Sequence, residues 1–210
     1  MSKKILEIGG FVSGAILIAF GVAVIALGAQ GRSTVNSNLK AEQIVGSSDM
    51  TPAAIKTEVA QAGLTGVSLP SCSVADKAIN SGNRARCFAQ YMRIHALEAT
   101  GGVPYSQMPR YATADGKGTN DAAKALTADG RPVDNAARNV WVTETALSTA
   151  LNMSYMAEQL GNFGIVVGVA LLLSGFGFVI LAVGGALRAG GWLFARKAKA
   201  AAKTTIPVGV

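Results

Sequence analysis

Two long apolar runs without a charged residue constrain this chain more than any other feature. The first covers residues 8–31 and the second covers residues 159–187. As helices that rise 1.5 Å per residue they would be about 36 Å and 44 Å long, whereas the hydrocarbon core of a bilayer is about 30 Å thick. Both runs are continuously apolar and do not alternate, which is typical of membrane helices and not of barrel strands. We therefore predict an all-α membrane protein with two transmembrane helices.

The first run has a second interpretation, as a cleaved signal peptide. Lys3 and Lys4 form a basic start, and residues 26–28 resemble a cleavage site made of small residues. The run is longer than the roughly 7–15 residues of a secretory hydrophobic region. Its length favours an uncleaved anchor.

Excess positive charge is concentrated at the two ends of the chain. The N-terminal tail (residues 1–7) has two lysines and one acidic residue, and the C-terminal tail (residues 188–210) has five basic residues and no acidic one. The segment between the runs, residues 32–158, is nearly balanced, with 12 basic and 11 acidic residues. By the positive-inside rule both tails are cytoplasmic, the protein lies in the plasma membrane and residues 32–158 are extracytoplasmic. The middle segment has no basic patch interleaved with aromatics, so we expect no nucleic-acid partner.

The C-terminal tail carries an interfacial pattern. Trp192, Leu193 and Phe194 come directly before a group of four cations. Aromatic and basic side chains both favour the headgroup region of a bilayer. The pattern predicts a stop-transfer anchor, with a regulated lipid-binding switch as the alternative.

Small residues recur at intervals of seven in both runs. They are Gly14, Gly21 and Gly28 in the first run and Gly161, Gly168 and Gly175 in the second. This spacing keeps the glycines on one face of a gently supercoiled helix, and small faces let helix backbones approach closely in lipid. The two rows could pack on each other as an antiparallel hairpin, or serve a homo-oligomer or a larger membrane-protein partner.

The second run extends backwards in the same heptad phase as far as Val140. We therefore predict one helix over residues 135–187 with Asp134 as its N-cap. Its first part, residues 135–158, would be a stalk continuous with the transmembrane helix of residues 159–187. The first helix would continue in the same way through residues 35–42, giving a two-helix stalk.

We expect residues 32–134 of the middle segment to form a thin helical region that packs against this stalk. One helix should begin at Thr51-Pro52 and stop before Gly63, and a short one should begin at Ser73. A third should cover residues 83–100. Residues 111–136 contain few large apolar side chains, and we expect them to form a mobile loop.

Cys72 and Cys87 are the two cysteines of the sequence. Disulfides persist outside the cytosol, and closing a loop of this size stabilises a fold by about 3 kcal/mol in the chain-entropy model. The spacing is not that of a redox-active Cys-x-x-Cys pair. We predict a structural disulfide.

An apolar face of the third helix is a candidate ligand face. Its residues are Phe88, Tyr91, Met92 and His95, at helical spacings of three and four, with Tyr105 nearby. His95 is the single histidine, and we expect it to act in packing or in a pH- or ligand-sensitive role. Acid–base catalysis would need a positioned partner, and the nearest by helical spacing are Tyr91 and Glu98.

No specific signal for an enzyme is present. One histidine and two cysteines are too few for a Cys/His zinc site, and the common hydrolase, protease and nucleotide-binding motifs do not occur. We predict no catalytic residues, no cofactor-binding residues and no metal site.

Residues 82–108, which include Ala89, His95, Gly102 and Tyr105, and residues 140–168 resemble a group of small actinobacterial membrane proteins. The resemblance implies two spans joined by an exterior helical loop. Some members are labelled aromatic-ring-opening dioxygenases, but extradiol metal chemistry needs about two histidines and a carboxylate, and this chain has one histidine. The resemblance therefore transfers no active site, and the cysteine pair departs from the group.

Two functions remain open at this point. The first is a non-enzymatic integral membrane scaffold or accessory subunit of an envelope or membrane complex. The alternative is an extracytoplasmic sensing or binding module for a lipid or envelope component. The glycine rows and the stalk favour the scaffold.

Overall fold

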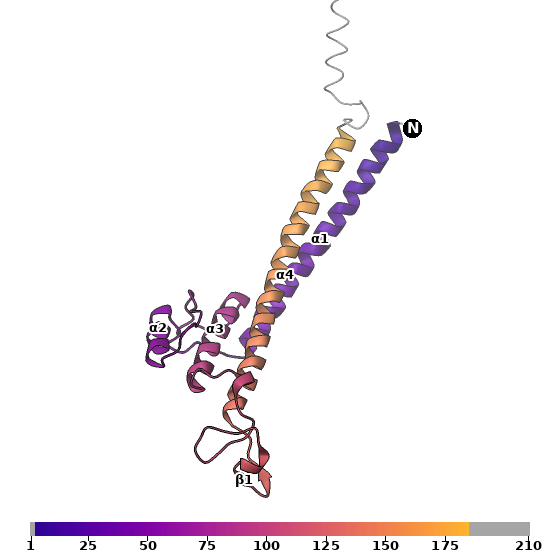
Figure 1. Ribbon diagram of the computed structural model, residues 1–210. Coiled ribbons are helices and arrows are strands. Elements are labelled where there is room, and N and C mark those ends of the chain that lie inside the picture. Colours follow the sequence, from indigo (N-terminus) through magenta and orange to yellow (C-terminus); the bar gives the residue numbers. More distant parts are fainter. Residues whose placement is uncertain (1–2, 185–210) are drawn as a thin grey trace, which may run out of the picture. The chain divides into compact units, whose positions relative to one another are not determined.

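The computed structural model describes residues 3–184, which are mostly helical (Figure 1). In chain order the elements are α1 (Lys3–Ala41), α2 (Pro52–Gln61), α3 (Gly82–Ala99), the short 3-10 helices η1 (Tyr105–Gln107) and η2 (Ala122–Lys124), β1 (Thr127–Ala128), β2 (Arg131–Pro132) and α4 (Ala137–Val183). The chain divides into two compact units. The first contains residues 3–31 and 160–184 of the described chain, and the second contains residues 32–159.

The first unit consists of the apolar parts of α1 and α4. Both helices are long and apolar enough to cross a membrane, with mean hydropathies of 2.5 and 2.7 in their most apolar windows. Only 11% and 17% of the residues in those windows are buried in the structure. A core helix of a soluble protein would be mostly buried, so these values suggest a membrane location, as the sequence analysis predicted.

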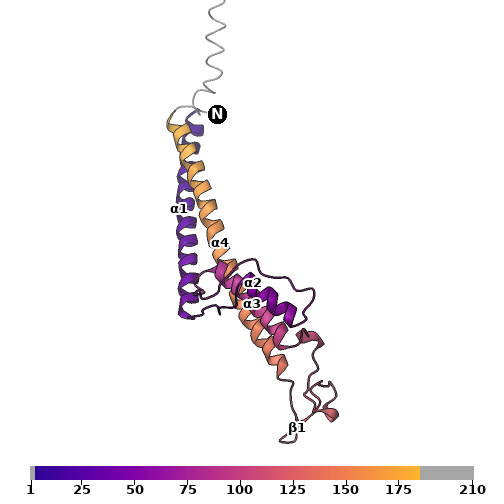
Figure 2. The same cartoon turned by 90° about the vertical axis from the view of Figure 1, so that its left-hand side faces the viewer.

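The two helices lie side by side in both views (Figures 1 and 2) and meet along the glycines. A Cβ atom added to Gly21 would lie 2.8 Å from the carbonyl oxygen of Gly168, and one added to Gly168 would lie 2.8 Å from that of Gly21. Equivalent contacts join Gly14 to Gly175 and Gly28 to Gly161. The structure therefore answers the question that the sequence left open, because the two glycine rows pack on each other.

Large apolar side chains cover the opposite sides of both helices. Exposed examples are Ile16, Phe20 and Leu27 on α1 and Phe163, Val166, Leu173 and Ile180 on α4. Their exposure is what contact with lipid tails requires, because such side chains would not be left in water in these numbers.

The second unit has a core built on the remaining parts of α1 and α4. Leu39 of α1 and Leu151 of α4 are buried in the same cluster as Ile55 of α2 and Tyr91 of α3. The expected stalk segments thus form part of the core of this unit. α1 ends at Ala41, one residue before the expected Glu42.

The segment after α1 pairs with the segment before α3. The N–H of Gly46 donates to Lys77 O (3.0 Å), and the N–H of Ile79 donates to Ile44 O (2.9 Å). Gly46 is required here because a Cβ would collide with the carbonyl of Val74. The short helix expected from Ser73 is therefore wrong, since this stretch bonds across to residues 44–50 instead of forming local helical bonds.

The two shorter helices begin and end as their sequences predicted. The Thr51 hydroxyl accepts a hydrogen bond from the N–H of Ala54 at the start of α2, and the Ser81 hydroxyl accepts one from the N–H of Arg84 at the start of α3. Gly63 and Gly101 follow the two helices with positive φ angles of 66° and 60°, a conformation that glycine adopts without strain.

α3 is joined to its surroundings by a disulfide and a close approach to α4. Cys72 and Cys87 are bonded, with their Cα atoms 6.1 Å apart, which confirms the predicted pair. A Cβ on Gly82 would lie 2.8 Å from the Cα of Tyr155, and the Gly82 N–H donates to the buried carboxylate of Glu158 at 2.7 Å. A carboxylate at the first turn of a helix also interacts favourably with the helix dipole.

Residues 111–136 contain more regular structure than the expected mobile loop. β1 and β2 pair as an antiparallel hairpin around Asp129-Gly130, whose φ angles of 50° and 73° are those of a two-residue hairpin turn. Tyr111 bridges to Thr119 and to Asp134. Asp134 is thus held in a bridge, and the side chain of Asn135 caps α4 instead, accepting from the N–H of Ala137 at 3.1 Å.

Two expectations lie outside the described residues. They are the end of the second span at residue 187 and the basic tail of residues 188–210, with Trp192, Leu193 and Phe194.

The glycine contacts generate a stability prediction. We expect Gly21→Ala to destabilise the helix pair by about 1–3 kcal/mol, because its methyl group would overlap the backbone of α4. The measurement is the free energy of unfolding of the full chain in detergent. Gly177→Ala is the matched control, since nothing lies within 4 Å of its added Cβ, and it should be neutral or slightly stabilising. Equal effects of the two changes would contradict the assigned contact.

Candidate functional site

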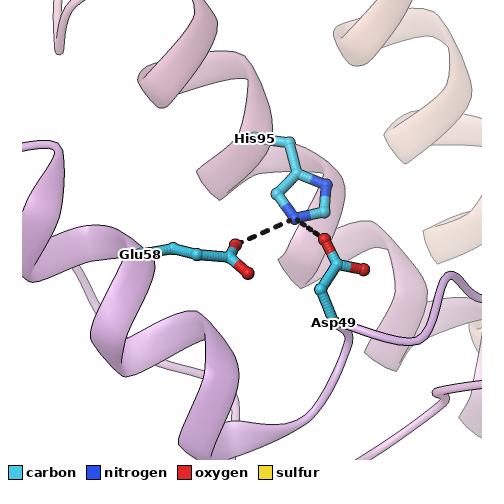
Figure 3. Close-up of side chains that lie close together, drawn as sticks. All are labelled: Asp49, Glu58 and His95. Carbon is cyan, nitrogen blue, oxygen red and sulfur yellow. Dashed lines mark ion pairs between the residues drawn. The ribbon is translucent and has the colours of Figure 1, made fainter.

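The single histidine lies against two carboxylates (Figure 3). His95 Nε2 is 3.4 Å from Asp49 Oδ2 and 3.7 Å from Glu58 Oε2. One potential ligand atom from each residue lies within 4.8 Å of the other two. The three side chains point toward a common position from α3, from the segment after α1 and from α2.

Each side chain of this cluster is positioned by a buried neighbour. Glu58 lies one helical turn after Ile55, which is fully buried and turns the same face of α2 toward α3. His95 follows the fully buried Ile94. Asp49 is in a turn closed by a hydrogen bond from the N–H of Met50 to Ser47 O. The side chain of Met50 is buried, which anchors this turn in the core.

Two atoms of the cluster have unsatisfied hydrogen-bonding capacity. His95 Nε2 and Asp49 Oδ1 are buried, and neither has a hydrogen-bond partner among the residues that the structure describes. The side chains as a whole are 26% exposed for His95, 38% for Asp49 and 26% for Glu58. The cluster is therefore open to small solutes from the surface, although its polar atoms point inward.

This arrangement can act chemically in two ways. A protonated His95 can form an ion pair with both carboxylates. Alternatively, a neutral imidazole and the two carboxylates can bind a divalent cation, because all three are common metal ligands when deprotonated. Two carboxylates this close repel each other unless a positive charge lies between them.

The predicted ligand face is divided by the structure. Phe88 and Tyr91 are buried in the core, and Met92 is half-buried against it. Tyr105 is exposed, with the guanidinium carbon of Arg138 lying 4.2 Å from its ring centroid. Four of the five residues thus serve packing or the cluster of His95, and they do not present one continuous surface to a ligand.

Sequence reasoning selected His95 but not its partners. Glu98, its partner by helical spacing, is not in the cluster, and Tyr91 is occupied elsewhere, donating from its hydroxyl to Cys72 O at 2.6 Å. Asp49 and Glu58 carry no motif that relates them to a histidine many residues further along. Their proximity arises from the pairing of residues 44–50 with residues 74–79 and from the packing of α2 on α3.

A separate cavity of about 680 Å³ lies beside α3. Residues 62–69 form one of its walls, and Arg93, Leu97, Gly101, Gly102 and Pro104 contribute to the rest. None of the three cluster residues lines it. The cavity and the cluster are therefore distinct candidate sites.

Comparison with known proteins returned no match from protein-family models, curated proteins or solved structures.

Burial of Tyr91 generates a pH prediction. Desolvation, with a smaller contribution from the charge of Asp49, raises the pKa of this phenol above its ordinary value. A raised pKa in the folded state means that stability is fully present below the ordinary tyrosine pKa, about 10, and is lost as the pH rises through the raised value. Tyr91→Phe should therefore reduce stability by about 1–2 kcal/mol at neutral pH, because Cys72 O loses its donor, and should lose less stability above pH 10 than the wild type.

The measurement is the free energy of unfolding of the full chain at a series of pH values from 8 to about 11. Tyr105→Phe, on an exposed tyrosine, is the control and should follow the wild type. A Tyr91→Phe profile parallel to that of the wild type would contradict the assignment.

Proposed function

We propose that the protein is a non-enzymatic integral membrane scaffold or accessory subunit. Its helical hairpin anchors it in the plasma membrane, and residues 32–159 form an extracytoplasmic domain that contacts a partner. The partner is a larger membrane protein or a second copy of the chain. The actinobacterial proteins that the sequence resembles have two spans joined by an exterior helical loop. We propose the same arrangement for this chain.

One observation carries this proposal, namely an uncovered apolar face on α4 within the second unit. Val142, Met153 and Met156 are 56%, 61% and 60% exposed, and their spacing places them on one side of the helix. The glycine rows are already occupied by each other, so they offer no free face for a partner. The exposed face of α4 is therefore the surface that we assign to partner contact.

Two independent features support an extracytoplasmic location for residues 32–159. The disulfide between Cys72 and Cys87 belongs to this segment, and such bonds persist in oxidising compartments. The basic residues of the sequence outside this segment lie near the two ends, which favours cytoplasmic tails.

A second candidate function, a sensing or binding module for a lipid or envelope component, is favoured by the cavity beside α3. Its volume of about 680 Å³ is within the range of small-molecule sites. The experiment below separates the two candidates.

The scaffold proposal predicts a partner that depends on the exposed face of α4. Full-length tagged protein purified from its own membranes in mild detergent should carry a stoichiometric membrane protein or a second copy. Met153→Glu should reduce the amount recovered at least about tenfold, because a buried unpaired charge weakens an interface by 2 kcal/mol or more. The readouts are native mass and quantitative protein identification.

Leu126→Glu is the matched control for this experiment, because Leu126 is also an exposed apolar residue but lies outside α4. It should leave recovery unchanged. A monomer without a partner, or equal losses with both variants, would contradict the scaffold. Stabilisation of that monomer by a lipid or envelope extract would then support the binding module.

The proposed topology predicts opposite labelling of two engineered thiols. Lys117→Cys, at an exposed position in the second unit, should react with a membrane-impermeant maleimide in intact cells. Lys203→Cys, in the basic tail, should react only after the membrane is permeabilised. The wild type controls for background, because its two cysteines are bonded to each other. The reverse pattern would overturn the orientation.

A further inference from the structure

We propose that Asp49, Glu58 and His95 form a binding site for a divalent transition-metal ion of the Zn²⁺ class. This site lies in the second unit and does not depend on the scaffold function. The sequence led us to predict no metal site, because it has too few histidines and cysteines for a Cys/His zinc site and too few histidines for an extradiol-type metal site.

The distances favour coordination over direct hydrogen bonding. Metal–ligand bonds to histidine nitrogen and carboxylate oxygen are about 2.0–2.2 Å, so neighbouring ligands in a tetrahedral site are about 3.3–3.6 Å apart. His95 Nε2 lies 3.4 Å from Asp49 Oδ2, within this range, and 3.7 Å from Glu58 Oε2, slightly above it. These separations are longer than the 2.7–2.9 Å of a charge-assisted N–H···O bond.

The unsatisfied atoms point to the same conclusion. A buried imidazole nitrogen without a hydrogen-bond partner is destabilising, and so is a buried carboxylate oxygen without one. His95 Nε2 and Asp49 Oδ1 are both in this state within residues 3–184. A cation between the three side chains would coordinate the nitrogen and neutralise the repulsion between the two carboxylates.

The ligand set selects the class of ion. Imidazole suits zinc and its neighbours in the first transition series, whereas calcium and magnesium favour sites made entirely of oxygen. Three protein ligands leave a fourth tetrahedral position for water or for another ligand. The 26–38% exposure of the three side chains leaves that position accessible from solvent.

A metal at this position would link two neighbouring segments to α3, which lies about 40 residues further along the chain. Asp49 belongs to the segment after α1, Glu58 to α2 and His95 to α3. Because the folded state presents the three ligands together and the unfolded chain does not, the ion should stabilise the folded second unit.

The test is a Zn²⁺ titration of the full-length protein in detergent, after chelator treatment and with an affinity tag that contains no histidine. A chromogenic chelator reports the free ion, and the melting temperature is a second readout. We expect one Zn²⁺ per chain, a higher melting temperature with Zn²⁺, and little response to Mg²⁺ or Ca²⁺.

Three variants remove the ligands one at a time: Asp49→Asn, Glu58→Gln and His95→Gln. Each should weaken Zn²⁺ binding at least about 100-fold, because loss of a direct ligand should exceed the 10–100-fold effect of losing a supporting contact. Glu98→Gln is the matched control, since Glu98 is on α3 near His95 but outside the cluster. It should bind as the wild type does.

Circular dichroism and an intact disulfide, checked by mass, establish that each variant is folded. Absence of stoichiometric Zn²⁺ binding by the wild type would overturn the proposal and leave the cluster as an ion pair. Binding that survives all three ligand substitutions would overturn it as well. Neither result would change the interpretation of the partner experiment, which tests a different surface, the exposed face of α4.

Discussion

Backbone-to-backbone contact between α1 and α4 is the constraint on which the membrane unit depends. In lipid there is no hydrophobic force between helices, so association relies on close packing. Removing the Cβ at three paired positions, such as Gly21 and Gly168, brings each carbonyl within reach of the opposite helix. Large side chains such as Ile25 and Leu172 pack over the glycines of the facing helix, and other large apolar side chains face outward.

The second unit relies on other interactions, since it has few large apolar residues. Its core is held by covalent and polar links as well as by burial. Cys72 and Cys87 join the loop to α3, and Tyr91 donates to the carbonyl of Cys72. Glu158 accepts the N–H at the start of α3. α2 and the segment after α1 pack on this same face of α3, and the His95 cluster lies where the three segments meet.

Local signals in the sequence predicted the elements well, because caps and spacing are local. Thr51 and the heptad glycines gave a correct helix start and correct contacts. One failure involved non-local pairing, because a helix was predicted to start at Ser73 but residues 74–79 bond to residues 44–50. The hairpin at Asp129-Gly130 was missed although that dipeptide is a known turn signal. The partners of His95 could not be found, because Asp49 and Glu58 reach it only through tertiary packing.

The seven-residue spacing of the glycines also makes the hairpin's alignment discrete. In the observed alignment three glycine pairs meet. Sliding one helix by seven residues, about 10 Å, would bring Gly14 opposite Gly168 and Gly21 opposite Gly161, and so would keep two pairs. Any smaller slide would place side chains against the opposing backbone. The two helices can therefore pair only in separate alignments seven residues apart, and the observed alignment is the one with the most glycine pairs.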